Sequence, residues 1–177
     1  MSRYRSLIVL IFSAFAGLSA CTRGCNDPND WAKAVLNADQ GFQFPPGFPP
    51  DPAKPGKTTI DGIDSDRDGL RDDVQRWIYA RYPNEERKRK ALRQMAVYFQ
   101  IDRSPINEPQ ELLKLARRSS KAITCLMDAF GESDEMELVR AKVLNTADRT
   151  DRYLQTDAKY DGMVLGPSYP SDGTACE

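Results

Sequence analysis

Apolar residues in the second half of the chain recur every three or four residues, which is the spacing of one face of an α-helix. The pattern predicts helices over residues 72–81, 85–101, 107–130 and 133–154. No stretch of useful length alternates apolar and polar residues as a half-buried strand does. We therefore expect an all-α fold, a small bundle of about four helices. The positions expected to face its core are Val74, Trp77, Ile78, Leu92, Met95, Ala96, Phe99, Leu112, Ala116, Ile123, Leu126, Phe130, Met136, Val139, Val143, Ala147 and Leu154.

Local signals set the ends of these helices. Pro83 follows the first helix and stops it, because proline withholds a backbone N–H. Asn107 with Gln110 resembles a capping box at the start of the third helix, and Gly131 closes that helix. Ser133 is expected to cap the last helix.

Two polar stripes on the predicted helices are interpreted as solvent-exposed faces. The first is the basic cluster of residues 87–90 with Arg93, for which contact with anionic lipid head groups is the alternative. The second lies along the last helix, where a ligand-binding stripe or a second layer around the Asp-rich segment described below is the alternative. It consists of Asn145, Arg149, Arg152 and Tyr153. The Asn-Thr pair at 145–146 is unfavourable inside a long helix.

Residues 1–20 have the features of a signal peptide. Two arginines precede an apolar run at residues 7–16. This run is too short to span a bilayer, which takes about 20 residues. The sequence Leu18-Ser19-Ala20-Cys21 follows and resembles the lipobox of bacterial lipoproteins. The resemblance implies cleavage before Cys21 and acylation of that cysteine, which would be the contact with the membrane. Ordinary secretory cleavage after Ala20 is the alternative.

The same resemblance implies a location in the bacterial cell envelope. Lipoproteins retained at the inner membrane usually carry Asp after the acylated cysteine, whereas Thr22 and Arg23 stand here. We therefore expect a lipid-anchored protein of the outer membrane that faces the periplasm. Several acyl chains, at about 0.8 kcal/mol per buried CH₂, hold such a protein firmly.

Residues 21–57 are predicted to be a lipidated N-terminus and a proline-rich linker. Six prolines lie between positions 45 and 55, so this stretch is neither a regular helix nor a central strand. We expect an extended spacer with a rise of about 3.1 Å per residue. Phe42, Phe44 and Phe48 leave two alternatives: they pack back on the domain, or the segment is a ligand for an aromatic groove.

Composition limits the size and chemistry of the protein. Of the 177 residues, 40% are hydrophobic. This is enough for one small domain. Loss of residues 1–20 would remove two of the 25 basic residues and leave 23 against 26 acidic residues, so we expect no nucleic-acid partner. The chain has no histidine, which excludes Ser-His-Asp and Cys-His nucleophile systems and every zinc site that needs imidazole. We therefore expect that the protein is not an enzyme.

The segment from Asp64 to Asp73 carries the one chemical motif. Carboxylates at alternate positions, then a glycine, then further acids suit a hard cation such as Ca²⁺, which takes six to eight oxygens. The segment resembles EF-hand loops and the Asp-rich loops of dockerins and thrombospondin type 3 repeats. That resemblance implies Ca²⁺ as the bound ion. It implies as ligands the side chains of Asp64, Asp66 and Asp68, the carbonyl of Leu70, and Asp72 directly or through water.

The segment departs from an EF-hand in several ways. The twelfth position, usually a bidentate glutamate, is Gln75, and the eighth, usually apolar, is Arg71. Asp73 is the candidate for the missing charge. We expect weak affinity, with a Kd of about 10⁻⁴ to 10⁻³ M. The alternative is an ion-free turn in which Asp72 and Asp73 cap the next helix.

The calcium loop and bundle are assigned to residues 58–161 and a C-terminal tail to residues 162–177. In the oxidising periplasm the three cysteines other than Cys21 predict one disulfide and one spare thiol. The tail has little else to hold it, so we expect the pair Cys125–Cys176, with Cys25–Cys176 as the second choice.

Two segments resemble parts of small exported proteins of proteobacteria: residues 69–75, and Asn145-Thr146 with Arg149 and Tyr153. The resemblance implies a shared helical fold and brings no activity. The expected function is a membrane-tethered, non-catalytic calcium-binding module with a structural or interaction role and an unknown protein partner. The alternative is an immunity or inhibitor lipoprotein against a periplasmic toxin or cell-wall hydrolase. A third possibility, hydrolysis of glycosides by paired carboxylates, is less favoured, because a cation explains these carboxylates better.

Overall fold

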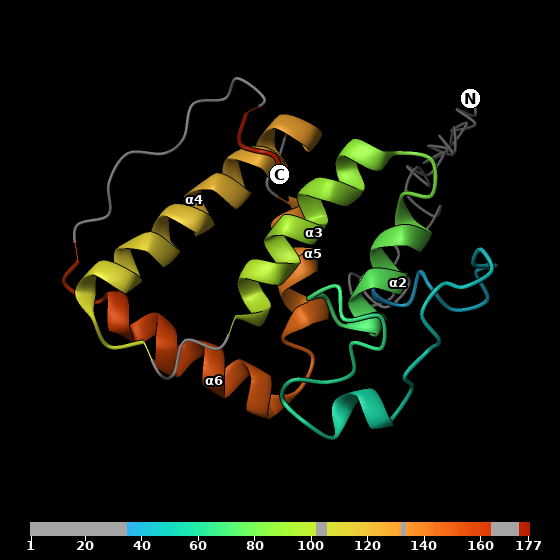
Figure 1. Ribbon diagram of the computed structural model, residues 1–177, viewed down its shortest axis with the longest axis horizontal. Coiled ribbons are helices and arrows are strands. Elements are labelled where there is room, and N and C mark those ends of the chain that lie inside the picture. The colour runs from blue at the N-terminus through green and yellow to red at the C-terminus, as the bar shows by residue number, and fades with distance from the viewer. Residues whose placement is uncertain (1–34, 102–105, 132–133, 164–173) are drawn as a thin grey trace, which may run out of the picture.

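The computed structural model describes residues 35–101, 106–131, 134–163 and 174–177. The predicted all-α class is confirmed: the described residues form helices and connecting segments, and none forms a strand. Helix α3 lies in the middle, with α4 on one side and α2 on the other, and α5 also packs against it (Figure 1). The helices are α2 (Asp72–Arg81), α3 (Glu86–Gln100), α4 (Pro109–Phe130), α5 (Asp134–Val143) and α6 (Ala147–Asp157), with short 3₁₀ helices η1 (Pro55–Lys57) and η2 (Ala158–Tyr160).

The core lies where α2, α3, α4 and α5 meet. Fully buried side chains from all four helices fill it, and they are Val74, Trp77, Leu92, Met95, Ala96, Leu126, Val139 and Val143. The indole N–H of Trp77 donates a hydrogen bond of 2.8 Å to the carbonyl of Val35. The buried ring therefore keeps a polar partner. No helix in the described part of the chain combines the length and apolar character needed to cross a membrane.

Helix α2 spans the predicted residues, but α4 begins differently. The expected capping box at Asn107 does not form, because α4 starts at Pro109 after Glu108, which makes no side-chain cap. Proline suits the first position, where its missing N–H is not needed. At the other end, Gly131 closes α4 as expected, with its N–H bonded to the carbonyl of Met127 at 2.8 Å. Ser133 lies outside the described residues.

The predicted last helix is two helices, α5 and α6, so the structure has five α-helices in its described part where four were expected. The break falls at the Asn-Thr pair. The side chain of Thr146 accepts the N–H of Arg149 and caps α6, and Thr150 Oγ1 donates to the carbonyl of Leu144 at 3.0 Å. These local bonds replace the helical bonds that a continuous helix would make.

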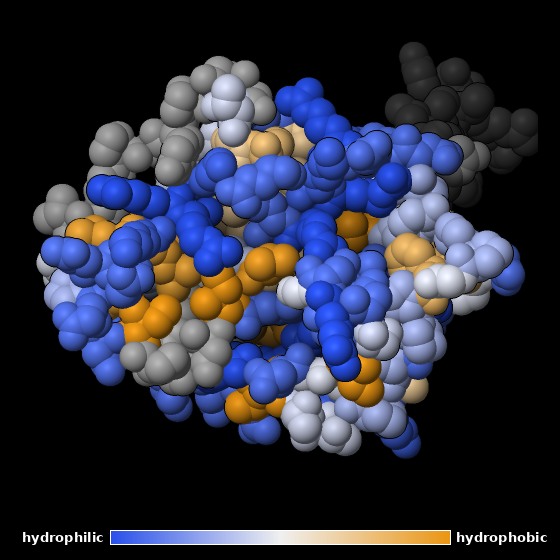
Figure 2. All heavy atoms as spheres, viewed as in Figure 1, coloured by the Kyte–Doolittle hydropathy of each residue, from blue (hydrophilic) through white to orange (hydrophobic). Residues whose placement is uncertain are grey.

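Several predicted core positions face outward. Ala147 is exposed, Leu154 is 57% exposed and Ile123 is 39% exposed. On α4 the predicted core positions Leu112 and Leu126 are buried, and the rest of the buried face is formed by Leu115, Ala122, Thr124 and Cys125, which were not predicted. Ile123 lines a cavity of about 490 Å³ between α3, α4 and the C-terminal helices. Hydrophobic atoms gather in this region of the surface (Figure 2).

The proline-rich segment packs on the domain over its described residues and does not extend away from it. The rings of Phe42, Phe44 and Phe48 surround Tyr79 of α2, with centroid distances of 6.0, 6.1 and 4.9 Å. The guanidinium of Arg76 lies 3.9 Å from the centre of the Phe44 ring, a favourable position for a cation. The expectation of an extended spacer is therefore wrong here, and the packing alternative is confirmed. Residues 21–34 lie outside the described part.

Arg149 is buried, not solvent-exposed as predicted, and ties residues 56–60 to α6. Only 2% of the residue is exposed, and its guanidinium donates to the carbonyls of Gly56, Thr59 and Ile60 at 2.7, 2.9 and 2.8 Å. Burial first, and then the charge of Arg71, lowers the pKa of Arg149. Gly62 has a positive φ, and a Cβ there would collide with both arginine side chains. Only glycine fits this position without strain.

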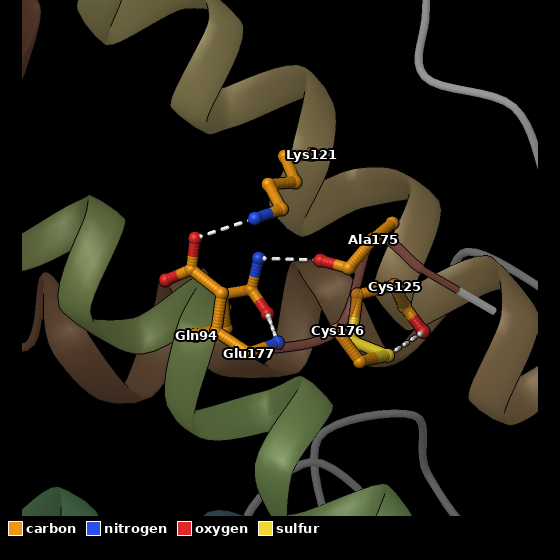
Figure 3. Close-up of a disulfide and its surroundings, with 6 residues drawn as sticks. All are labelled: Gln94, Lys121, Cys125, Ala175, Cys176 and Glu177. Atoms are coloured by element: carbon orange, nitrogen blue, oxygen red, sulfur yellow. Dashed lines mark hydrogen bonds and ion pairs between the residues drawn. A yellow bond between two sulfur atoms is a disulfide. The ribbon is translucent and has the colours of Figure 1, made fainter.

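The predicted disulfide Cys125–Cys176 is confirmed and fastens the last residues to α4 (Figure 3). The side-chain amide of Gln94 on α3 holds the same segment, donating to the carbonyl of Ala175 at 3.0 Å and accepting from the N–H of Glu177 at 3.1 Å. Cys25, the other candidate partner, lies outside the described residues.

Replacement of both bridge cysteines, C125A/C176A, is expected to lower the free energy of unfolding by about 4 kcal/mol. The bridge joins residues 51 positions apart, and closing such a loop restricts the unfolded chain by this amount. Urea unfolding measures the change. C25A is the control, and an equal loss in C25A would contradict the assignment of the bridge.

R149M is expected to lower the free energy of unfolding by at least about 3 kcal/mol, because three backbone carbonyls lose a charged donor. Urea unfolding again provides the measurement. R152M is the matched control: Arg152 pairs with Asp61, whose side chain is 86% exposed. Loss of this pair is therefore expected to cost no more than about 1 kcal/mol. Equal costs in the two variants would show that Arg149 does not support the segment.

Candidate metal centre

The Asp-rich loop is fixed at both ends. The N–H of Asp72, the first residue of α2, donates to the carbonyl of Ile63 at 2.9 Å and closes the loop at its base. Leu70, 1% exposed, anchors the loop in the hydrophobic core. Directly before Leu70 the chain turns at Gly69, whose φ of 86° belongs to the left-handed region that favours glycine. The loop therefore holds its acidic residues close together at the start of α2.

Three of the six predicted ligands form one group. Asp64, Asp66 and Asp72 each place a carboxylate oxygen within 4.8 Å of the other two. Asp72 is fully buried, and its Oδ1 accepts the N–H of Ser65 at 2.9 Å, but its Oδ2 is also buried and has no hydrogen-bond partner. A buried carboxylate oxygen without a donor is costly unless a cation approaches it.

Backbone amides of the loop orient Asp64. Its Oδ1 accepts the N–H of Asp68 at 3.2 Å and its Oδ2 accepts the N–H of Gly69 at 2.9 Å. At Asp66, slight burial acts to raise the pKa, but hydrogen bonds from Gln75 and from the loop outweigh it and hold the pKa below its ordinary value. Asp66 is therefore ionised at neutral pH, as a metal ligand must be.

The carboxylate of Asp68 pairs with the guanidinium of Arg93. Its Oδ2 accepts Arg93 Nη1 at 2.6 Å and Gln75 Nε2 at 3.1 Å, and its Oδ1 accepts the N–H of Leu70 at 2.9 Å. The second Nη of Arg93 donates to the backbone carbonyl of Asp68 at 2.6 Å. The guanidinium of Arg93 thus neutralises the negative charge of Asp68 in the structure.

Asp73 lies apart from the acidic group. Its carboxylate accepts Arg71 Nε at 2.9 Å and Asn145 Nδ2 at 3.2 Å. Burial acts to raise its pKa, but the hydrogen bond and charge of Arg71, with the charges of Lys142 and Arg149, outweigh burial and lower the pKa. The structure therefore brings Asp73 into an ion pair and not into the acidic group. The backbone carbonyl of Leu70 remains a predicted ligand.

Two side chains that contribute to the site, those of Gln75 and Arg93, were not predicted as part of it. Gln75 donates to Asp66 and Asp68, both at 3.1 Å, while its Oε1 is buried and has no hydrogen-bond partner. Gln75 is the twelfth residue of the loop, where an EF-hand has a ligand, so its position in the sequence could have identified it as part of the site. Arg93 was assigned to a solvated face, and nothing in the local sequence points to Asp68. Asn145 supports the loop through Asp73, as the second-layer alternative proposed.

The arrangement is suited to holding a small, hard cation. Three carboxylates lie close together, and backbone N–H groups of the loop bond to each of them. Carboxylate and amide oxygens are the ligands that Ca²⁺ prefers. The acidic group is thus a candidate metal site, formed by Asp64, Asp66 and Asp72.

Comparison of the chain with known proteins gives no relative. No protein-family model, no curated protein and no solved structure matches it.

Proposed function

We propose that this protein is a lipid-anchored calcium-binding module of the bacterial cell envelope, without catalytic activity. Ca²⁺ bound at Asp64, Asp66 and Asp72, with Asp68 and the Leu70 carbonyl as further ligands, clips the loop to the start of α2. The folded body then serves as a structural or interaction module for a protein partner. Acylated Cys21 holds it at the periplasmic face of the outer membrane.

The observation that carries the calcium proposal is the buried Oδ2 of Asp72. This oxygen has no donor, although the residue is fully buried and lies beside two other carboxylates. An ion-free helix cap would not need this arrangement, because one carboxylate hydrogen-bonded to N–H groups is sufficient for capping. A divalent cation would supply the missing partner and relieve the repulsion among the three acids.

The lipid anchor is supported by the sequence around Cys21. An arginine-flanked apolar run of signal-peptide length stands directly before the lipobox sequence. The location matters for the calcium proposal as well, because a site with a Kd of about 10⁻⁴ to 10⁻³ M can fill only where Ca²⁺ is abundant.

Calcium is expected to stabilise the protein. With a Kd of about 10⁻⁴ M, about 5 mM CaCl₂ adds about 2 kcal/mol to the free energy of unfolding, which raises Tm by about 4–8 °C relative to a chelator. D66N is expected to abolish this rise and to melt higher than the wild type in chelator, because one repelling charge is removed. Thermal melts followed by circular dichroism measure both effects.

D61N is the matched control for this experiment. Asp61 is a nearby exposed aspartate outside the acidic group, paired with Arg152 at 3.0 Å, so the variant loses the same charge and is expected to keep the calcium response. Identical melting temperatures of the wild type with calcium and with chelator would refute the calcium proposal.

The anchor is expected to depend on one cysteine. In bacteria expressing the full chain, C21S is expected to abolish incorporation of radiolabelled palmitate and to release the protein from the membrane fraction. C25S is the matched control and is expected to keep both. Palmitate labelling that persists in C21S would rule out the proposed acylation.

A further inference from the structure

We propose that the face of α3 next to the Asp-rich loop is a docking surface for an anionic lipid bilayer, and that calcium gates it through Arg93. This inference rests on the calcium binding and lipid anchoring proposed above. Its basis is that one arginine both pairs with a predicted calcium ligand and lines two basic hollows on the protein surface.

Arg93 and a bound calcium ion would compete for the same carboxylate. The guanidinium holds Asp68 through two hydrogen bonds of 2.6 Å, one to Oδ2 and one to the backbone carbonyl. Gln75 Nε2 donates to the carboxylates of both Asp66 and Asp68 at 3.1 Å, so the carboxylate of Asp68 lies directly beside the acidic group. A divalent ion at the acidic group therefore weakens the hold of Asp68 on Arg93, both by drawing the carboxylate away and by repelling the guanidinium.

The hollows lie on either side of α3, and Lys90 and Arg93 line both. The first has a volume of about 250 Å³, lies between α3 and α4, and is also lined by Arg118 and Lys121. The second has a volume of about 210 Å³ and lies between α3 and α2. Its basic side chains also include Arg89, and its apolar side chains are Phe48, Leu70, Ile78 and Tyr79. Basic groups beside apolar and aromatic ones suit the head-group region of an anionic bilayer.

The acidic residues on this face leave it available to an anionic surface. Lys90 pairs with Glu86 at 3.5 Å and Lys121 with Glu177 at 2.7 Å, and the two glutamate side chains are 72% and 67% exposed. Such exposed pairs are weak and exchange readily for other anions. Arg93 is held more firmly, by two short hydrogen bonds, so its release is the step that calcium controls.

The path of the chain selects a bilayer as the partner. Residues 22–34 separate the proposed anchor at Cys21 from Val35. Even fully extended, this stretch spans no more than about 50 Å. After Val35 the chain runs along α2 to Phe48, which lines the second hollow. A protein acylated at Cys21 therefore has this face within reach of the membrane that holds it.

The test uses the full lipidated protein in vesicles, so the anchor is the same in every sample. Calcium affinity is measured by flow dialysis in phosphatidylcholine vesicles and in vesicles with about one third phosphatidylglycerol. Because coupling between two sites is reciprocal, docking on the anionic vesicle is expected to lower the calcium Kd about tenfold. Anionic lipid also raises the Ca²⁺ concentration at the vesicle surface. The response to anionic lipid that remains in the variants described below measures this contribution.

R93Q is expected to bind calcium several-fold more tightly than the wild type in neutral vesicles, because the competing cation is gone, and to show a smaller response to anionic lipid. K90Q/K121Q leaves the loop untouched, so it is expected to keep the wild-type Kd in neutral vesicles and to lose part of the response. R117Q removes an exposed arginine of α4 that lines neither hollow, and is expected to behave as the wild type.

An equal response to anionic lipid in the wild type and R93Q would overturn the gating role of Arg93. An equal response in K90Q/K121Q and R117Q would overturn the docking surface. Both results leave the proposed calcium function intact, because calcium still binds. Absence of calcium binding in both kinds of vesicle would refute the proposed function itself, and this inference with it.

Discussion

The carboxylate of Asp72 sets the main constraint on this structure. It is fully buried at the first turn of α2, close to the carboxylates of Asp64 and Asp66, and one of its oxygens has no donor. The partial positive charge of the helix N-terminus favours an acid there, but it does not supply the absent hydrogen bond. A cation bound beside Asp72 would supply the partner that this oxygen lacks.

Three arginines determine how the loop meets the rest of the protein. Arg71 joins α2 to the end of α5, donating to the carbonyl of Val143 at 3.0 Å, and also pairs with Asp73. Arg149 holds the residues before the loop, and Arg93 holds the loop from α3. Because these guanidinium groups bind mainly backbone carbonyls, they fix the path of a segment that has almost no regular secondary structure.

The sequence predicts those features that depend on neighbouring residues. Helix α2 follows from its apolar spacing and Pro83. Aspartates at alternate positions predict the members of the acidic group, but they also include Asp68, which pairs with Arg93. The pairing of Cys125 with Cys176 is the exception, because the two cysteines lie 51 positions apart; it follows from a cysteine count and a tail that needed an attachment. Burial of Arg149 is different, because its partners Ile60 and Thr59 lie 89 and 90 positions away in the sequence, where no local pattern records them. From the sequence alone, an arginine on a predicted helix indicates a solvent-exposed position. The backbone carbonyls that bury Arg149 are known only from the tertiary structure.

The acidic loop lies at the joint between the N-terminal segment and the helical bundle. From Val35 the chain passes over α2, is held at residues 56–60 by Arg149, and only then enters the loop and α2. Any pull on the proposed anchor at Cys21 would therefore reach the contact of Val35 with the core residue Trp77 first, and then the aromatic contacts at Tyr79 and the hydrogen bonds of Arg149. A cation bound to the loop, as proposed above, would strengthen the attachment of this segment to α2. Under the proposed function a weak site suffices, because the ion would hold this joint together and would not report a change in concentration.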